Sequence, residues 1–335
     1  MNTGMRQWPL VAALVLAAGC STSISGDAMP INADGDLPYA RSLTETDRDR
    51  LGYYAMIRSL DPCGLLDMAA LRDLGALRRF DAENTVNGCR AEIEVDRSDP
   101  TRSRLEVELS FVDDWDRTDW TTITVGGQSI GESVQNSPDQ ALGSNTCRSK
   151  IPFDGEYDLL LTVSRRTDEA ACPQARTIVA ATLPLLSQRP LRESSERKAR
   201  HAISMHDPCG SFEPLAAAHT ITLDRRTTPW SCVFYLDGDD DQAKRTITMS
   251  STAMSRLERS SGGATATSVA GNAAIRSPLA TVCEVEVAVG DPPDGNNYDP
   301  IAGSKSVTST IVVRGPDCDS AAELADIAVT TYLHG

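Results

Sequence analysis

The chain has 335 residues, a formal net charge of −15 and a pI of about 4.7, so acidic groups dominate its surface. This charge argues against nucleic acid and against anionic lipid headgroups as partners, because both repel an acidic surface. Nine cysteines would be unusual in a cytosolic protein and indicate an oxidising compartment.

The first twenty residues have the pattern of a bacterial export signal that ends at a cysteine for lipid attachment. Arg6 precedes an apolar run at 10–18, and small residues lead up to Cys20. We therefore expect residues 1–19 to be a signal peptide and Cys20 to carry lipid. The lipid would hold the protein on the outer face of the cytoplasmic membrane. Residues 20–43, rich in small and polar side chains, are expected to be the lipidated N-terminus and a flexible tether.

The other eight cysteines form two sets of four with similar spacing, separated by 26, 58 and 25 residues and by 23, 51 and 35 residues. The sets are Cys63, Cys89, Cys147 and Cys172, and Cys209, Cys232, Cys283 and Cys318. Each set begins within the phrase Asp-Pro-Cys-Gly, at 61–64 and at 207–210. This ordered recurrence predicts a duplicated domain. We expect the first copy at 44–190 and the second at 195–335.

The cysteines are expected to form disulfides within each copy. Four cysteines allow three pairings, and the similar intervals favour the shortest loops. The expected pairs are Cys63–Cys89, Cys147–Cys172, Cys209–Cys232 and Cys283–Cys318. A structural zinc site normally needs close ligand pairs, but the sequence has no C-x-x-C, and only Cys209 lies near a histidine, His206. The sequence therefore predicts neither a metal nor a cofactor.

In the first copy, residues 44–58 predict a helix, and Asp61 is expected to cap a second helix with Pro62 at its first position. Strands are expected to follow, with alternating apolar side chains in the first two. Their ranges are 91–95, 105–109, 121–125, 148–153 and 157–163. Cys172 opens the last helix. Its expected buried side chains are Ala175, Ile178, Val179 and Thr182.

The second copy repeats this order. Its expected strands are 233–236, 246–249, 285–289 and 308–313, and Leu324, Ile327 and Ala328 mark the buried face of its last helix. Helices at both ends of a run of neighbouring strands predict the α+β class. The expected architecture is two tandem copies of an antiparallel sheet flanked by helices, each with two disulfides.

The combination of an Asp-Pro-Cys phrase before a helix, a lipid-attachment motif and a later cysteine at the head of a strand resembles a known family. This is an uncharacterised family of surface lipoproteins of mycobacteria, nocardiae and related actinobacteria, with one copy at 44–187 and one at 195–335. An excess of arginine over lysine, 28 to 4, agrees with that origin. More loosely, each copy is similar to the extracellular sensor domains of mycobacterial receptor kinases. The family has no established catalytic residues, so the resemblance assigns none.

Two short segments could carry chemistry. Residues 127–131 match the G-x-S-x-G pattern of α/β-hydrolases, with Ser129 as the nucleophile. All histidines lie in the second copy, so we favour a hairpin turn, and an esterase-like hydrolase using Ser129 is the alternative. Residues 237–241 are acidic, but Gln242 and Thr248 stand where a calcium loop needs glycine and glutamate. A solvated turn between two strands is expected there.

Trp115 and Trp120 lie in an acidic segment, 113–120, and are the candidate binding residues. Tryptophan is common at binding hot spots, but the same rings could instead cover the edge of a small core. The sequence thus predicts a lipid-anchored protein of the cell envelope that binds a ligand or another protein and is not an enzyme. Its expected partners are the membrane, through the lipid on Cys20, and either an envelope protein or a small apolar ligand.

Overall fold

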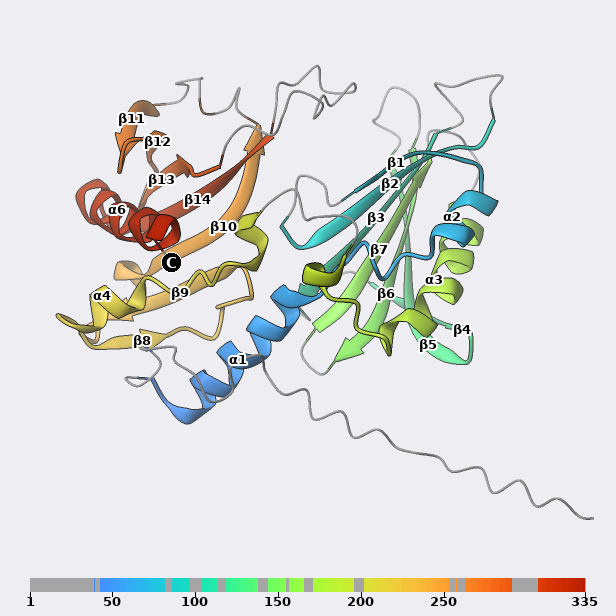
Figure 1. Ribbon diagram of the computed structural model, residues 1–335, viewed down its shortest axis with the longest axis horizontal. Coiled ribbons are helices and arrows are strands. Elements are labelled where there is room, and N and C mark those ends of the chain that lie inside the picture. The colour runs from blue at the N-terminus through green and yellow to red at the C-terminus, as the bar shows by residue number, and fades with distance from the viewer. Residues whose placement is uncertain are drawn as a thin grey trace, which may run out of the picture.

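The structure is a computed structural model, and it describes residues 39, 43–81, 86–96, 104–113, 119–137, 144–154, 157–165, 171–195, 202–253, 257, 263–290 and 307–334. The chain forms two seven-stranded antiparallel sheets that lie side by side, each with helices packed on one face (Figure 1). The predicted α+β class with two tandem copies is confirmed.

The first sheet has the strand order β1-β2-β3-β7-β6-β5-β4. Its strands are β1 (Ala76–Asp81), β2 (Gly88–Glu94), β3 (Arg104–Asp113), β4 (Thr121–Val125), β5 (Gln128–Ser137), β6 (Ser144–Asp154) and β7 (Tyr157–Arg165). Its helices are α1 (Glu45–Ser59), α2 (Met68–Asp73) and α3 (Cys172–Leu186). The short 3₁₀ turn η2 (Arg192–Ser194) leads to the second copy.

The second sheet has the order β8-β9-β10-β14-β13-β12-β11, which is the same topology with β8 in the place of β1. Its strands are β8 (Ile221–Leu223), β9 (Ser231–Leu236), β10 (Arg245–Ala253), β11 (Thr265–Val269), β12 (Asn272–Pro278), β13 (Cys283–Ala288) and β14 (Val307–Gly315). Its helical segments are η3 (Ala202–Met205), α4 (Phe212–Ala216), η4 (Asp241–Ala243) and α6 (Cys318–His334). Equal strand order in both sheets supports the duplication inferred from the cysteine spacing.

The long C-terminal helix of each copy covers its sheet because both present an apolar stripe. α3 packs on β4, β6 and β7, and α6 packs on β10, β11, β13 and β14 (Figure 1). The buried side chains of α3 include Ala175, Ile178, Val179 and Thr182, all predicted. In α6 the residues 146 positions later are buried, namely Ala321, Leu324, Ala325 and Ala328, whereas Ile327 is only partly buried. The two helices therefore occupy equivalent positions.

All four disulfides pair as predicted from the spacing. The bonds are Cys63–Cys89, Cys147–Cys172, Cys209–Cys232 and Cys283–Cys318. The first bond of each copy joins the Asp-Pro-Cys segment to the strand next to the sheet edge, β2 or β9, and the second joins the long helix to the sheet. Each loop has 23 to 35 residues, which corresponds to about 3–4 kcal/mol in the chain-entropy model.

The predicted second helix starts later than expected. Asp61 does not cap it: its carboxylate accepts the Cys63 amide at 3.0 Å, and its carbonyl accepts the Gly64 amide, which closes a turn. The helix begins at Met68, where Asp67 accepts the amides of the second and third helical residues. In the second copy Asp207 forms the same turn, with the Cys209 amide at 3.0 Å. Cys63 is bonded to Cys89 of β2, and the chain turns at this bond before the helix begins.

Two segments outside the sheets are more ordered than predicted. Tyr39 and Leu43, expected in the tether at 20–43, are buried, so these two residues belong to the folded part. In the linker, Arg192 is buried and donates hydrogen bonds to the carbonyls of Arg58 and Val86. Burial lowers the pKa of Arg192 to about 10. The beginning of the linker is therefore packed against the first copy.

Candidate functional site

The predicted site residues fall into two groups. Cys20 and Trp115 lie outside the described residues. The eight paired cysteines, Ser129 and Trp120 are described, and each has a defined environment.

Ser129 lies on a β-hairpin. It is exposed on β5 and pairs with Thr124 of β4. The turn before it consists of Gly126 and Gly127, with φ of 56° and 82°, as a two-residue hairpin turn with both central φ angles positive requires. A nucleophile elbow instead needs a strand followed by a helix. The second copy has the same turn at Ala270 and Gly271, with φ of 46° and 80°.

The described histidines do not complete a catalytic group around Ser129. His206, His219 and His334 belong to the second copy: the first follows η3, the second precedes β8, and the third ends α6. His219 binds Asp237 at 2.7 Å in the turn after β9. Within the described residues, the structure therefore contains a hairpin serine and not a Ser-His pair.

Ser129→Ala is expected to change the free energy of unfolding by less than about 0.5 kcal/mol, because it removes only an exposed hydroxyl. Urea denaturation of the wild type and the variant measures this difference. A serine-reactive activity probe should label neither protein at this position. Labelling that disappears in Ser129→Ala would revive the hydrolase.

The acidic segment at 237–241 connects β9 to β10, as expected of a turn. Asp237 has φ of 52°, and the hydrogen bonds that it accepts from His219 and from the Thr220 amide lower the pKa of its carboxyl. Asp239 forms an ion pair with Arg245. Backbone amides and basic side chains thus hold these carboxylates in the turn.

Trp120 is half-buried against the face of the first sheet that lies opposite α3. A side-chain carbon added to Gly131 would lie 3.3 Å from the indole, so the glycine makes room for the ring. The Arg148 guanidinium lies 5.9 Å from the centre of the indole. In the second copy the residue before β11 is Ala264, and Ile275 takes the place of Gly131. This exchange of large and small residues favours a packing role for the Trp120 ring.

One group of described side chains has the spacing of a metal site. The ligand atoms of Glu132, Cys147 and Cys172 lie within 4.8 Å of one another. The two sulfurs form a disulfide, so they are not thiolates, and both oxygens of Glu132 accept hydrogen bonds from Arg176 at 2.6 and 2.8 Å. These contacts raise the pKa of the Arg176 guanidinium. The group is an ion pair beside a disulfide.

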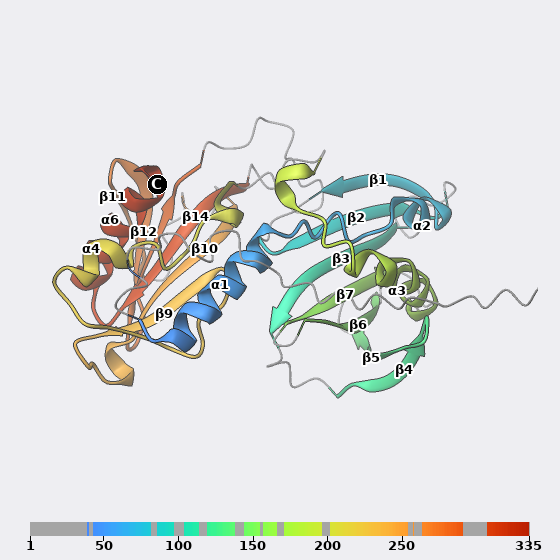
Figure 2. The same ribbon diagram turned by 60° about the horizontal axis from the view of Figure 1, so that its bottom comes forward.

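Side chains of the two copies meet at the interdomain junction. We use this name for Tyr39, Tyr54, Arg58, Phe111, Arg192, Asp207 and Trp230. In both ribbon views α1, which carries Tyr54 and Arg58, lies between the two sheets (Figure 1, Figure 2). The sequence gives no sign of this junction, because its hydrogen-bond partners are up to 173 residues apart.

Polar contacts at the junction are directed to the second copy. The Tyr54 hydroxyl donates to the Thr227 carbonyl at 2.8 Å, and the Arg58 guanidinium donates to the Pro229 carbonyl at 2.9 Å. Arg58 also lies 3.6 Å from the carboxylate of Asp207, which accepts a hydrogen bond from the Tyr39 hydroxyl. Burial and this carboxylate raise the pKa of Tyr39 far above its ordinary value.

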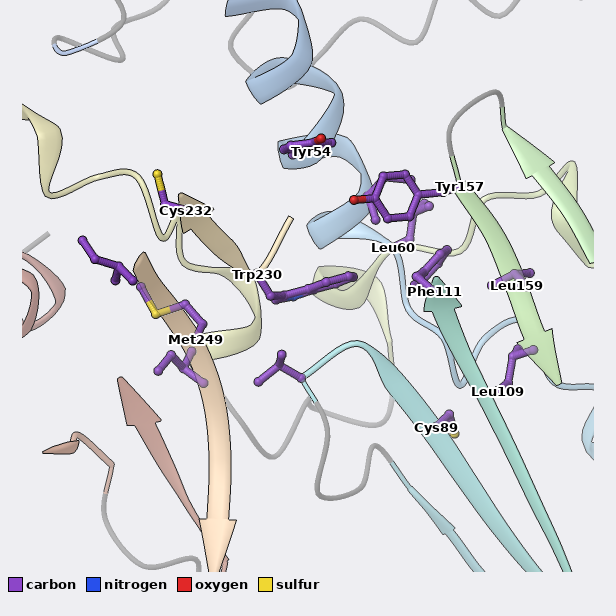
Figure 3. Close-up of a cluster of buried hydrophobic side chains, with 14 of the residues drawn as sticks. Tyr54, Leu60, Cys89, Leu109, Phe111, Tyr157, Leu159, Trp230, Cys232 and Met249 are labelled. Carbon is purple, nitrogen blue, oxygen red and sulfur yellow. The ribbon is translucent and has the colours of Figure 1, made fainter. Parts of the chain in front are cut away.

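Apolar contacts complete the junction. Trp230 lies between Phe111 of the first sheet and Met249 of the second (Figure 3). Its ring centre is 6.2 Å from that of Phe111, and its indole N–H donates to the Ser204 carbonyl at 3.0 Å. A buried, hydrogen-bonded aromatic side chain thus contacts residues of both copies.

The chain matches no family model and no curated protein. Among solved structures it is similar to two di-domain ARO/CYC proteins, StfQ from the steffimycin pathway and BexL from the BE-7585A pathway. Both are 8% identical and cover 82% of this chain, which spans 88% and 90% of theirs, with TM-scores of 0.15 and 0.14. Likenesses this distant carry no argument about this chain. None of the helices described here is long and apolar enough to cross a membrane.

Proposed function

We propose that the protein is a lipid-anchored component of the cell envelope and that its two coupled domains form a non-enzymatic binding module. The observation that carries the proposal is the set of four disulfides, each within one domain. Such bonds persist in extracytoplasmic compartments. The lipid-attachment pattern at Cys20 and the resemblance to actinobacterial surface lipoproteins support the same location.

The binding role is proposed from the contacts that join the two domains. Hydrogen bonds and a ring contact at the interdomain junction link the two domains, so a partner would meet a surface to which both contribute. An envelope protein or a small apolar ligand would be bound in this way. Trp115 and Trp120 remain candidates for contact with such a partner, although Trp120 also packs against the sheet.

Cys20→Ala is expected to abolish labelling of the protein by an alkynyl fatty acid and to release the protein into the medium. The wild type should be labelled and remain with the membrane, because its only proposed anchor is the lipid. Ser21→Ala, which changes the next residue and keeps the thiol, is the matched control and should behave as wild type. Persistent labelling of Cys20→Ala would contradict the proposal.

A further inference from the structure

Because the domain is duplicated, each residue of the first domain can be compared with its counterpart in the second. Two buried hydroxyls of the first domain have apolar counterparts. Ser149 and Thr182 are both fully buried, and neither hydroxyl has a hydrogen-bond partner among the described residues. Ser149 lies on β6, on the same face as Cys147, which is bonded to α3. Thr182 lies on the buried stripe of α3. Both hydroxyls are therefore between α3 and the first sheet.

The counterparts follow from the disulfides. Ser149 is two residues after the strand cysteine, where the second domain has Val285 after Cys283. Thr182 is ten residues after the helix cysteine, where the second domain has Ala328. Val285 and Ala328 are also buried. The same topology is thus built with apolar residues at both positions, and the hydroxyls are not needed for the fold.

A buried hydroxyl without a partner is unfavourable, because it has lost its hydrogen bonds to water. Among its described residues, the second domain also has one such hydroxyl, that of Thr310. Thr310 alternates along β14 with Ile311 and so lies on the face opposite α6. In the described structure, the unpartnered hydroxyls between helix and sheet are those of the first domain. The first domain thus keeps two hydroxyls in its interior at positions where the second domain has apolar residues.

A charged pair connects this place to the surface. Ser149 pairs across the strands with Glu132 of β5, whose carboxylate is held by Arg176 of α3. Glu132 is buried, whereas the Arg176 side chain is 50% exposed. In the second domain the corresponding residues are Arg276 and Ala322, which cannot form an ion pair with each other. In the first domain an ion pair thus joins a half-exposed guanidinium to a buried carboxylate beside Ser149.

We propose that the first domain, and not the second, binds a small and largely apolar molecule with one hydroxyl or carbonyl group between α3 and β5–β6. The polar group would bond to Ser149 or Thr182, and the apolar part would contact the surrounding buried side chains. These include Ile130, Ile151, Ile178 and Val179. A single water molecule does not fit this place, because an isolated water needs two to four polar partners and Thr182 lies among the apolar side chains of Ala175, Ile178 and Val179. The proposal specifies the ligand class of the binding role proposed above.

The test uses the Cys20→Ala chain, which retains every described residue, with benzyl alcohol and toluene as probes. Saturation-transfer NMR should show that the chain binds benzyl alcohol at least fivefold more tightly than toluene. The double variant Ser149→Ala/Thr182→Val, which is nearly isosteric, should lose that preference while its toluene binding persists. Ser133→Ala, on β5 but on the opposite face, is the control and should bind as the parent does.

Three results would overturn the proposal. The first is that neither probe binds, and the second is that the double variant keeps its preference for the alcohol. The third is that the double variant melts at a higher temperature than the parent while the alcohol does not stabilise the parent. The last result would identify two hydroxyls that are simply unsatisfied. Labelling of the wild type by the alkynyl fatty acid is independent of this interior, so failure here leaves the proposed anchoring unaffected.

Discussion

Trp230→Ala is expected to lower the free energy of unfolding by about 3–5 kcal/mol, the range for truncating a buried aromatic side chain. Trp230 is 6% exposed, contacts Phe111 and donates to the Ser204 carbonyl. The change removes the ring between the two sheets. Guanidinium denaturation followed by circular dichroism should show a lower midpoint and two separate transitions, because the domains lose their main apolar contact.

Two further variants show whether the effect belongs to the junction. Trp230→Phe keeps a ring beside Phe111 and removes the indole N–H, so we expect a loss of about 1 kcal/mol. Trp120→Ala removes a half-buried indole from one sheet and should lower stability less than Trp230→Ala, with a single transition as in the wild type. Equal losses for the two alanine variants would show that the junction contributes no particular stability.

The features predicted correctly depend on local sequence. The disulfide pairing followed from intervals that recur in both copies, since a short loop between cysteines leaves few alternatives. The buried stripe of α3 followed from the helical period, because Ala175, Ile178, Val179 and Thr182 recur every three or four residues. The central strands β3 and β7 were visible because one face of each is apolar.

The strands that were missed lack this signal. β1 and β8 form one edge of their sheets, and β8 has three residues. β5 and β12 pair with the opposite edge strands, β4 and β11, and carry many exposed side chains. Such strands are held by backbone hydrogen bonds. Because these bonds do not depend on side-chain type, the side-chain pattern gives little sign of the strands. Ser129 belongs to one of these strands, which is why its surroundings could not be predicted beyond a hairpin.

The interdomain junction could not be predicted for a different reason. Arg58 occupies the last turn of α1, where a basic residue is ordinarily explained by the helix dipole. Its partners, Pro229 and Asp207, lie in the other copy. Contacts between residues so far apart in the sequence depend on how the two domains pack. No periodic pattern within either copy predicts that packing.

Arg58→Met is expected to lower the free energy of unfolding by about 3 kcal/mol, as for removal of one partner of a buried ion pair. Arg58 is 4% exposed, and methionine retains much of its apolar length. The change leaves the Pro229 carbonyl without its donor and Asp207 without the guanidinium 3.6 Å away. Thermal unfolding of the full chain should show a lower midpoint, with the second domain melting separately.

Arg50→Met on the same helix is the matched control. Arg50 pairs with Asp47 one turn away, at a position where the ion pair is partly exposed. Such pairs contribute about 0–1 kcal/mol, so this variant should unfold nearly as the wild type does. If both variants lose the same stability, or if Arg58→Met still unfolds in one transition, Arg58 does not couple the domains. A large loss confined to Arg58→Met would show that a single buried guanidinium on α1 joins the two copies.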